Sequence, residues 1–370
     1  MKIVLASVLK PVNDSRVYEK IGLSLSKIIN SEIHILGTST FKNTVPVKNI
    51  TFHPYNKMDK KPTRITTSRL FLSLINEIKP DILIVHTIEL LPALLYYKFY
   101  NRKVKIVYDM LENYPFNFRY QQFRSPLKSK ILSTLSNLIE KVSYPFLSYI
   151  FLAEKTYLKE KKLPLSKSVI LENKYSPIHH FTKKKKEEFN TISFVFCGSL
   201  TKIFGVVEVI KWFSGLSSCN SILNYKLTII GKAYESDVIQ ALDKFAQNNK
   251  LVQCIGVKEF VPHEDIIREM FSCDFVLLPY PENQCTTNCI PTKLYECLAL
   301  GVPMITQENL LWKKVCKESN GSLFIDFKQP IEIKSFEQKI KSFTPYPNGI
   351  DQKAFWYSEE KKLLNIIETL

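Results

Sequence analysis

The sequence predicts an α/β protein built from two Rossmann-like, doubly wound domains side by side. Its 370 residues exceed the usual size of one domain, so two domains with separate cores are expected. Short apolar or β-branched runs alternate with stretches of helical periodicity in both halves of the chain, which is typical of parallel sheets covered by helices. A polar, charge-dense stretch between the two series marks the domain boundary.

Each expected strand is a short β-branched or apolar run. In the first half the runs are KIVLAS, EIHILG, ILIVH, VKIVY, YIFLA and SVILEN, and in the second half ISFVFC, YKLTII, LVQCIG, FVLLP, PMIT and SLFID. The two series place the first domain at residues 1–178, a linker at 179–190 and the second domain at 191–350. The remaining stretch, 351–370, has apolar residues at helical spacing and predicts a terminal helix.

Composition excludes several classes of protein. An apolar content of 45% with 12% aromatic residues is typical of a globular chain, and no apolar run reaches the roughly 18–20 residues of a membrane span. The N-terminal stretch MKIVLASVLKPVND contains Lys10 and Pro11 and lacks a small-residue cleavage pattern, so it resembles a first core strand. We therefore expect a cytoplasmic protein.

The cysteines predict neither disulfides nor a metal site. All eight lie in the second half, and none form a C-x-x-C pair, which favours reduced thiols packed in the interior. Cys285, Cys289 and Cys297 lie near each other in sequence, but no His is close and their spacing matches no zinc pattern. We expect no metal and no cofactor.

The positive charge is concentrated in the first domain. Residues 1–178 hold 28 Lys and Arg against 13 Asp and Glu, a net charge of +15, whereas residues 179–370 hold 23 against 22, a net charge of +1. A lysine-rich coding bias would have raised both halves. A one-sided basic domain indicates an anionic partner, either nucleic acid or membrane lipid. Because no nucleic-acid-binding motif accompanies the charge, we expect a membrane surface and no nucleic acid.

Residues 118–142 suggest which part of the basic domain meets the membrane. Cations crowd the start of this segment, and its apolar residues Leu127, Ile131, Leu135, Leu138 and Val142 recur at helical spacing. This pattern is compatible with a cationic surface helix. It is equally compatible with a helix that packs its apolar side on the domain core, as most amphipathic helices of α/β domains do.

A phosphate site is expected after the strand FVLLP. Pro291 and Gly301 bracket a predicted helix, since Pro favours a first helical position and Gly the position after the end. A helix N-terminus that follows a strand and loop binds anions through its free N–H groups and dipole. Lys293 in the first turn suits a bound pyrophosphate, and Glu296 suits ribose hydroxyls. From spacing alone, both are also explained as solvated surface charges.

The segment PTKLYECLALGVPMIT resembles the donor-site signature of family-4 glycosyltransferases, which have the GT-B fold. Other stretches agree with that family in order: NDSRVYEKIGLSLSK, VHTIELLPALL, VYDMLENYP, CGSLTKIFGVVEVI, LTIIGK and FWYSEEKKLLNIIETL. The resemblance spans almost the whole chain. It implies two domains facing across a cleft, with the C-terminal helix crossing back to the first domain.

The resemblance also implies donor-side and acceptor-side residues. The donor-binding residues would be Ser199, Lys202, Asn288, Thr292, Lys293 and Glu296. Asn288 stands where many members have the first Glu of an E-x7-E pair, whose second Glu is matched by Glu296, and Ser199 and Phe204 stand where many have Arg and Lys. The Asp-x-His-Glu variant is matched only by Asp109 and Glu112, which with His86 and Lys293 would be catalytic, and Arg16 would lie on the acceptor side.

The implied activity is a retaining, metal-independent hexosyl transfer. The donor would be a nucleotide-sugar, with UDP-sugar favoured, and the acceptor a lipid-linked saccharide in capsule, O-antigen or lipopolysaccharide biosynthesis. The enzyme would work at the inner face of the cytoplasmic membrane. The alternative is a non-catalytic sugar-nucleotide-binding partner subunit that kept the fold and lost the two loop cations.

Overall fold

The computed structural model describes residues 1–39, 46–55, 64–120, 125–178, 190–284 and 286–370. Within them the chain divides into two compact units, the first formed by Met1–Ser176 with Trp356–Leu370 and the second by Pro177–Phe355. The expected linker, 179–190, lies outside the described residues except for its last residue. No helix within the described ranges combines the length and the apolar character needed to cross a bilayer.

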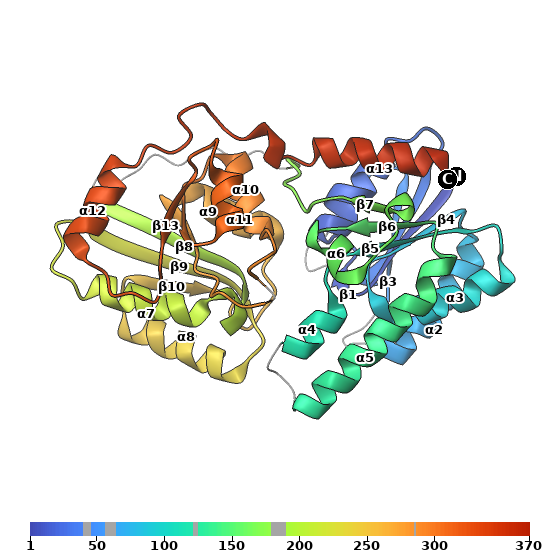
Figure 1. The fold of residues 1–370 in the computed structure, drawn as a ribbon, viewed down its shortest axis with the longest axis horizontal. Coiled ribbons are helices and arrows are strands. Elements are labelled where there is room, and N and C mark those ends of the chain that lie inside the picture. The colour runs from blue at the N-terminus through green and yellow to red at the C-terminus, as the bar shows by residue number, and fades with distance from the viewer. Residues whose placement is uncertain (40–45, 56–63, 121–124, 179–189, 285) are drawn as a thin grey trace. The chain divides into compact units, whose positions relative to one another are not determined.

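The described part of the first unit contains a seven-stranded parallel sheet in the order β3-β2-β1-β4-β5-β6-β7 (Figure 1). The strands are β1 Lys2–Pro11, β2 Glu32–Thr38, β3 Ile50–Pro54, β4 Ile82–Val85, β5 Lys105–Met110, β6 Tyr149–Leu152 and β7 Ser168–Ile170. Strand β1 pairs with both β2 and β4, so the strand order reverses between β1 and β4. In doubly wound folds, ligands bind beyond the carboxyl ends of the strands at this kind of reversal.

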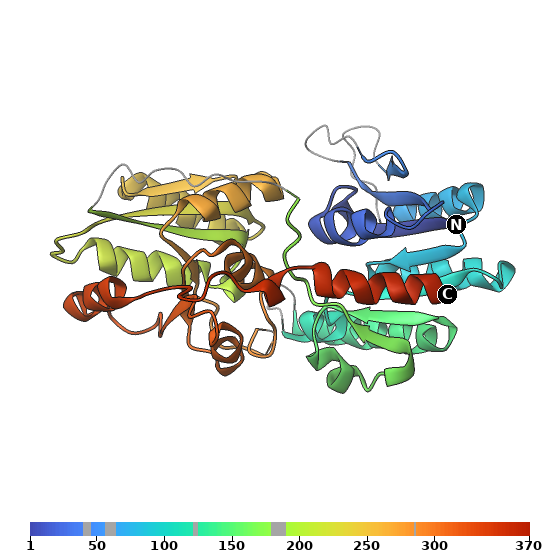
Figure 2. The ribbon, with the colours of Figure 1, turned by 90° about the horizontal axis from the view of Figure 1, so that it is seen from above.

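Helices cover both faces of this sheet (Figures 1 and 2). The longer ones are α2 Arg64–Ile78, α3 Leu91–Tyr100, α4 Tyr114–Tyr120, α5 Pro126–Ser143, α6 Thr156–Lys161 and α13 Tyr357–Thr369. The short ones are η1 Ser15–Gly22, α1 Leu23–Leu25, η2 Ile88–Leu90, η3 Tyr144–Phe146 and η4 Leu165–Lys167. One core cluster joins the sheet to α2, α3 and the inner edge of α5, and another joins its opposite face to η1, α1 and α13.

The C-terminal helix belongs to the first unit because its apolar side packs there. Leu363 and Ile367 are buried in the core cluster beneath α13. The Trp356 indole donates to Ser24 Oγ at 2.9 Å, and the buried carboxylate of Glu359 accepts from Lys174 Nζ at 2.7 Å. These contacts account for the helical periodicity seen in the sequence after residue 351.

The described part of the second unit contains a six-stranded parallel sheet in the order β10-β9-β8-β11-β12-β13 (Figure 1). The strands are β8 Thr191–Leu200, β9 Asn224–Ala233, β10 Val252–Ile255, β11 Phe275–Leu278, β12 Met304–Gln307 and β13 Ser322–Ile325. The helices are η5 Lys202–Phe204, α7 Val206–Ser217, α8 Ser236–Asn248, α9 His263–Ser272, α10 Thr292–Leu300, α11 Leu310–Cys316, α12 Ile333–Ser342 and η6 Gln352–Ala354. Here the strand order reverses between β8 and β11.

The predicted doubly wound architecture is confirmed in both units. Each of the runs named from the sequence contains a strand, because a strand covered on both faces must be apolar throughout, as β4 and β11 are. The sequence missed β3, an edge strand in which only Ile50 is fully buried. The helix expected over 118–142 is not one continuous element, since α4 ends at Tyr120, α5 begins at Pro126 and residues 121–124 lie outside the described ranges.

Candidate functional site

In the second unit, the segments that follow β8 and β11 pack against each other. Gly205, at the start of α7, has a φ of +89°, and a Cβ there would lie only 2.6 Å from the carbonyl oxygen of Pro279, the residue after β11. Only glycine fits this conformation and this close approach. The contact holds the start of α7 beside the end of β11, at the point where the strand order reverses.

Helix α10 begins at the same edge of the sheet. It follows Pro291 without a side-chain cap and ends at Gly301, whose φ of +67° is left-handed, so the predicted helix limits are confirmed. Because no side chain caps the start of this helix, the positive end of the helix dipole there favours an anion. Lys293 lies in this turn, and its Cε is 3.7 Å from the Cβ that a side chain at Gly198, near the end of β8, would have.

Lys293 and Glu296 form a buried ion pair one helical turn apart. Lys293 Nζ donates to Glu296 Oε2 at 2.6 Å, and His263 Nε2 lies 2.8 Å from Glu296 Oε1. The Glu296 side chain is 1% exposed and that of Lys293 is 12% exposed. Neither residue is a solvated surface charge, which was the alternative explanation of the sequence pattern.

The charges in this cluster stabilise one another. Burial by itself would raise the pKa of Glu296, but Lys293 and His263 outweigh it and lower that pKa to about 2. Burial likewise disfavours the Lys293 ammonium, and the adjacent Glu296 carboxylate outweighs it, so the pKa of Lys293 is raised. The pair is therefore ionised at neutral pH, with a positive charge held at the start of α10.

The other residues predicted on the donor side lie around this edge with different degrees of exposure. Ser199 is exposed near the end of β8, Thr292 is the half-buried first residue of α10, and Asn288 is exposed in the loop between β11 and α10. Their contacts with a donor stay predictions. Lys202 is exposed, and its ammonium is bonded to Asp237 and lies 3.7 Å from Glu235 at the start of α8, so its predicted contact with a diphosphate also stays a prediction.

Phe204 fills the position where a cation was expected by resemblance. Its ring centroid lies 5.1 Å from that of Tyr280, which in turn packs edge-on against Trp312 at 5.7 Å. This corner of the site is thus an aromatic cluster. At the start of α10, Lys293 adds a positive charge next to this cluster's edge of the sheet.

In the first unit, the strand ends at the reversal point hold a buried charged cluster. Asp109, at the end of β5, accepts two hydrogen bonds from Arg16, at 2.9 Å from Nε and 2.7 Å from Nη2. His86, directly after β4, contacts the same carboxylate through Nδ1 at 2.8 Å. Arg16 also donates to the Leu171 carbonyl at 2.9 Å, and its guanidinium lies 5.8 Å from the centre of the Trp356 ring.

The members of this cluster are buried in the structure, and the catalytic and acceptor-side roles predicted for them stay predictions. Asp109 and His86 are 0% exposed and Arg16 is 1% exposed, so none of them presents a surface to an acceptor. Burial would raise the pKa of Asp109, but Arg16 and His86 reverse the effect and lower it. Among the described residues, His86 Nε2 has no hydrogen-bond partner. The cluster fastens the η1 loop to the ends of β4 and β5, which is a positioning role.

Glu112 lies apart from this cluster. It is exposed, and its Oε2 accepts from Asn117 Nδ2 at 3.0 Å within the same loop and helix. The structure therefore brings together Arg16, His86 and Asp109 but leaves Glu112 outside, although the resemblance placed all four on the acceptor side.

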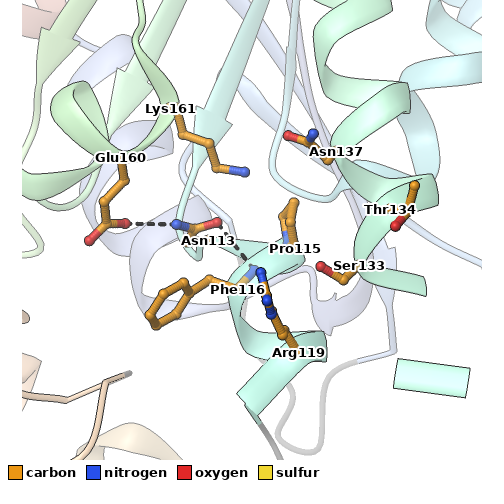
Figure 3. Close-up of a pocket in the computed structure, with 9 residues that line it drawn as sticks. All are labelled: Asn113, Pro115, Phe116, Arg119, Ser133, Thr134, Asn137, Glu160 and Lys161. Atoms are coloured by element: carbon orange, nitrogen blue, oxygen red, sulfur yellow. Dashed lines mark hydrogen bonds between the residues drawn. The ribbon is translucent and has the colours of Figure 1, made fainter. Parts of the chain in front are cut away.

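A pocket of about 420 Å³ opens close to Glu112, between α4, α5 and α6. Figure 3 shows α5 side chains on one side, Glu160 and Lys161 on the other, and Asn113 between them, with Nδ2 donating to Glu160 Oε2 at 2.7 Å. The lining residues are Asn113, Pro115, Phe116, Arg119, Ser133, Thr134, Asn137, Glu160 and Lys161. Amides, hydroxyls, a carboxylate and an aromatic ring are the groups that bind sugar hydroxyls and sugar faces.

Sequence reasoning did not single out His263 or the pocket residues. His263 opens α9 and is 33 residues from its partner Glu296, so no local pattern links them. The pocket residues come from three separate helices. Within the described residues, no group of three or more His, Cys, Asp or Glu side chains is placed to hold a metal ion. The described cysteines are free thiols, and Cys285 lies outside the described residues.

Comparison with known proteins identifies the second unit by sequence and the whole chain by fold. Residues 178–345 match the sequence model of the family described as glycosyl transferases group 1. Comparison with curated protein sequences finds no match. Sucrose-phosphate synthase from Thermosynechococcus elongatus has a similar structure, with a TM-score of 0.71 at 9% identity, covering 100% of this chain and 98% of that one.

Two further solved structures are similar over their full lengths. The lipopolysaccharide outer core galactosyltransferase WaaB, in its apo form, has a TM-score of 0.59 at 14% identity, covering 100% of this chain and 99% of the other. UDP-GlcNAc 2-epimerase from Neisseria meningitidis, bound to UDP-GlcNAc, has a TM-score of 0.60 at 12% identity, covering 100% of both chains. The matched residues, 178–345, include the whole cluster of His263, Lys293 and Glu296. The family match over residues 178–345 and the GT-B fold of the similar structures together support a glycosyltransferase.

Proposed function

We propose that this enzyme transfers a hexosyl group from a UDP-sugar to a lipid-linked saccharide, with retention of anomeric configuration and without a metal ion. The product would enter capsule, O-antigen or lipopolysaccharide synthesis. The enzyme would work in the cytoplasm, bound peripherally to the inner face of the cytoplasmic membrane.

The observation that carries the proposal is the buried pair at the start of α10. Lys293 supplies a fixed positive charge beside an uncapped helix N-terminus, at the carboxyl edge of the sheet where the strand order reverses. Breaking the bond between a sugar and a diphosphate places negative charge on the departing diphosphate. Preorganised charge and N–H donors at that place lower the barrier, and they do so without a metal. Glu296 is the candidate partner of the ribose hydroxyls.

Three features support the choice of substrates. UDP is favoured because a similar structure, the epimerase from Neisseria meningitidis, is bound to UDP-GlcNAc. A saccharide acceptor is favoured by the pocket between α4, α5 and α6, with its amide, hydroxyl and aromatic lining. The net charge of +15 over residues 1–178 favours an acceptor presented on an anionic membrane.

The test is release of nucleoside diphosphate from a panel of sugar nucleotides, with and without lipid extract as acceptor. We expect turnover with one UDP-sugar, loss of turnover in Lys293→Met, and none of this loss in Lys250→Met, an exposed lysine of the same unit. Tight UDP binding without turnover on any donor would refute the proposed transfer. That outcome would favour the non-catalytic sugar-nucleotide-binding subunit.

A further inference from the structure

Helix α5 carries its apolar side toward solvent. Five apolar residues form a stripe along it and are each between 50% and 69% exposed: Leu127, Ile131, Leu135, Leu138 and Val142. The residues buried beneath the helix are instead Ser129, Ser136, Glu140 and Ser143. A helix that packs its apolar side on a domain core would bury these five residues. The explanation that they face the core is therefore wrong.

Specific polar contacts hold the helix in this orientation. The buried Glu140 carboxylate accepts from Lys161 Nζ at 2.5 Å and from the Tyr108 hydroxyl at 3.3 Å. The hydroxyls of Ser136 and Ser143 donate to carbonyls one turn earlier at 2.7 Å, so they need no other partner. A rotation that buried the apolar stripe would break these contacts and separate Glu140 from Lys161 and Tyr108.

Helix α3 extends the apolar area. Tyr96, Phe99 and Tyr100 are between 59% and 71% exposed, and the ring of Tyr100 lies 5.1 Å from that of Tyr96 and 5.2 Å from that of Phe99. Helices α3 and α5 pack against each other on the same side of the sheet (Figure 1). The exposed residues of both helices therefore face away from the sheet. We call these eight residues the α3–α5 surface.

All exposed charges on these two helices are positive. Lys128, Lys130 and Lys141 are exposed on α5, and Arg102 and Lys103 are exposed just after α3. The one carboxylate in α5, Glu140, is buried against Lys161, and α3 contains no acidic residue. An apolar area with tyrosines and a cationic border matches the interface of an anionic bilayer, where apolar side chains enter the acyl boundary and lysines meet headgroup phosphates.

We propose that the α3–α5 surface seats the first unit on an anionic lipid leaflet. This inference rests on the peripheral membrane location in the proposed function and assigns it to particular residues. A second copy of the chain is a poor occupant, since two such surfaces would oppose their lysines. An anionic leaflet neutralises the same lysines.

The surface also borders the pocket. Thr134, which lines the pocket, follows Ile131 by three residues and precedes Leu138 by four, so it lies along the edge of the apolar stripe. A lipid-linked saccharide standing in the leaflet would thus meet the pocket with its sugar while its lipid stayed in the bilayer.

The test is co-sedimentation with phosphatidylcholine vesicles, with and without phosphatidylglycerol, and in the absence of any sugar nucleotide. The stripe variant carries Ile131→Gln, Leu135→Gln and Leu138→Gln, and its control removes three exposed apolar residues elsewhere, Ile29→Gln, Leu165→Gln and Ile222→Gln. The charge variant carries Lys128→Gln, Lys130→Gln and Lys141→Gln. Its control carries Lys250→Gln, Lys317→Gln and Lys334→Gln, three exposed lysines of the second unit.

We expect wild type and both controls to bind the phosphatidylglycerol vesicles. The charge variant should bind them on the order of 100-fold more weakly, and the stripe variant at least about tenfold more weakly. No binding by wild type, or equal losses in variants and controls, would overturn the inference. So would a wild-type dimer in sedimentation equilibrium that the stripe variant dissociates, because the surface would then be a protein interface. None of these readouts depends on transferase activity, so the proposed transfer is tested separately.

Discussion

The buried pair of Lys293 and Glu296 makes a quantitative prediction. The perturbation is a double-mutant cycle of Lys293→Met, Glu296→Gln and the two together. The two charged groups are 2.6 Å apart, and their side chains are 12% and 1% exposed. Removal of either charge leaves the other buried, whereas removal of both leaves no uncompensated charge.

The structure sets the order of the effects. Glu296→Gln strands the ammonium of Lys293, so we expect the free energy of unfolding to fall by about 3–4 kcal/mol. Lys293→Met should cost less, about 2–3 kcal/mol, because His263 still contacts the Glu296 carboxylate at 2.8 Å. The double variant should cost about 2–3 kcal/mol, which leaves a coupling energy of about 3 kcal/mol.

The coupling should depend on pH in a defined direction. The pKa of Glu296 is lowered from 4.5 to about 2, so its contribution to stability is fully present above about pH 4.5 and is lost as the pH falls toward 2. The pKa of Lys293 is raised, so its contribution is fully present below 10.5 and is lost only at higher pH. Between these limits the coupling energy should be constant.

The assay is urea unfolding of the four proteins, followed by tryptophan fluorescence and circular dichroism at neutral and at acidic pH. Additive effects of the single substitutions at neutral pH would refute the buried pair. In parallel, UDP binding is measured by calorimetry. If all variants that fold bound UDP as wild type does, the pair would be structural and the donor site would lie elsewhere.

Three other predictions follow from the same contacts. His263→Gln should raise the donor KM about threefold to tenfold, with a smaller change in kcat. The reason is that His263 orients Glu296 and does not reach the diphosphate. A change in kcat without a change in KM would contradict this prediction. Gly205→Ala should lower the free energy of unfolding by about 2 kcal/mol or more, because its Cβ meets Pro279. Gly215→Ala, in the open interior of α7, should instead be stabilising by up to about 1 kcal/mol, and thermal unfolding compares the two variants. Asp109→Asn should cost about 3–5 kcal/mol, since it leaves Arg16 buried without its counter-ion, and urea unfolding measures it.

The fold could be predicted from the sequence because parallel strands covered on both faces carry an unmistakable pattern. Every residue of β4 and of β11 is buried, so polar residues are excluded from them. The same reasoning fails at a sheet edge. In β3 only Ile50 is fully buried, and the mixture of polar and apolar residues after it resembles a loop.

The donor-side site was predictable as far as its contacts are local. Pro291 and Gly301 mark the ends of α10, and residues three apart on a helix are neighbours, which brings Lys293 next to Glu296. His263 reaches the same carboxylate from α9, a contact that depends on how two helices pack and that leaves no local trace in the sequence. The contact of Lys202 with Asp237 was not predictable for a related reason, because Asp237 lies 35 residues away.

Helix α5 shows why the spacing of apolar residues does not tell which side of an amphipathic helix faces the sheet. Periodicity tells that apolar residues share one side, but either side can face the sheet. What decides is whether the polar side finds partners inside, and here Glu140 meets Lys161 and Tyr108 while small serines allow close packing. Those partners come from β5 and α6, far along the chain. The interior therefore selects the polar side of α5 and leaves the apolar stripe outside, where its exposed area is a cost to the isolated protein that contact with lipid would remove.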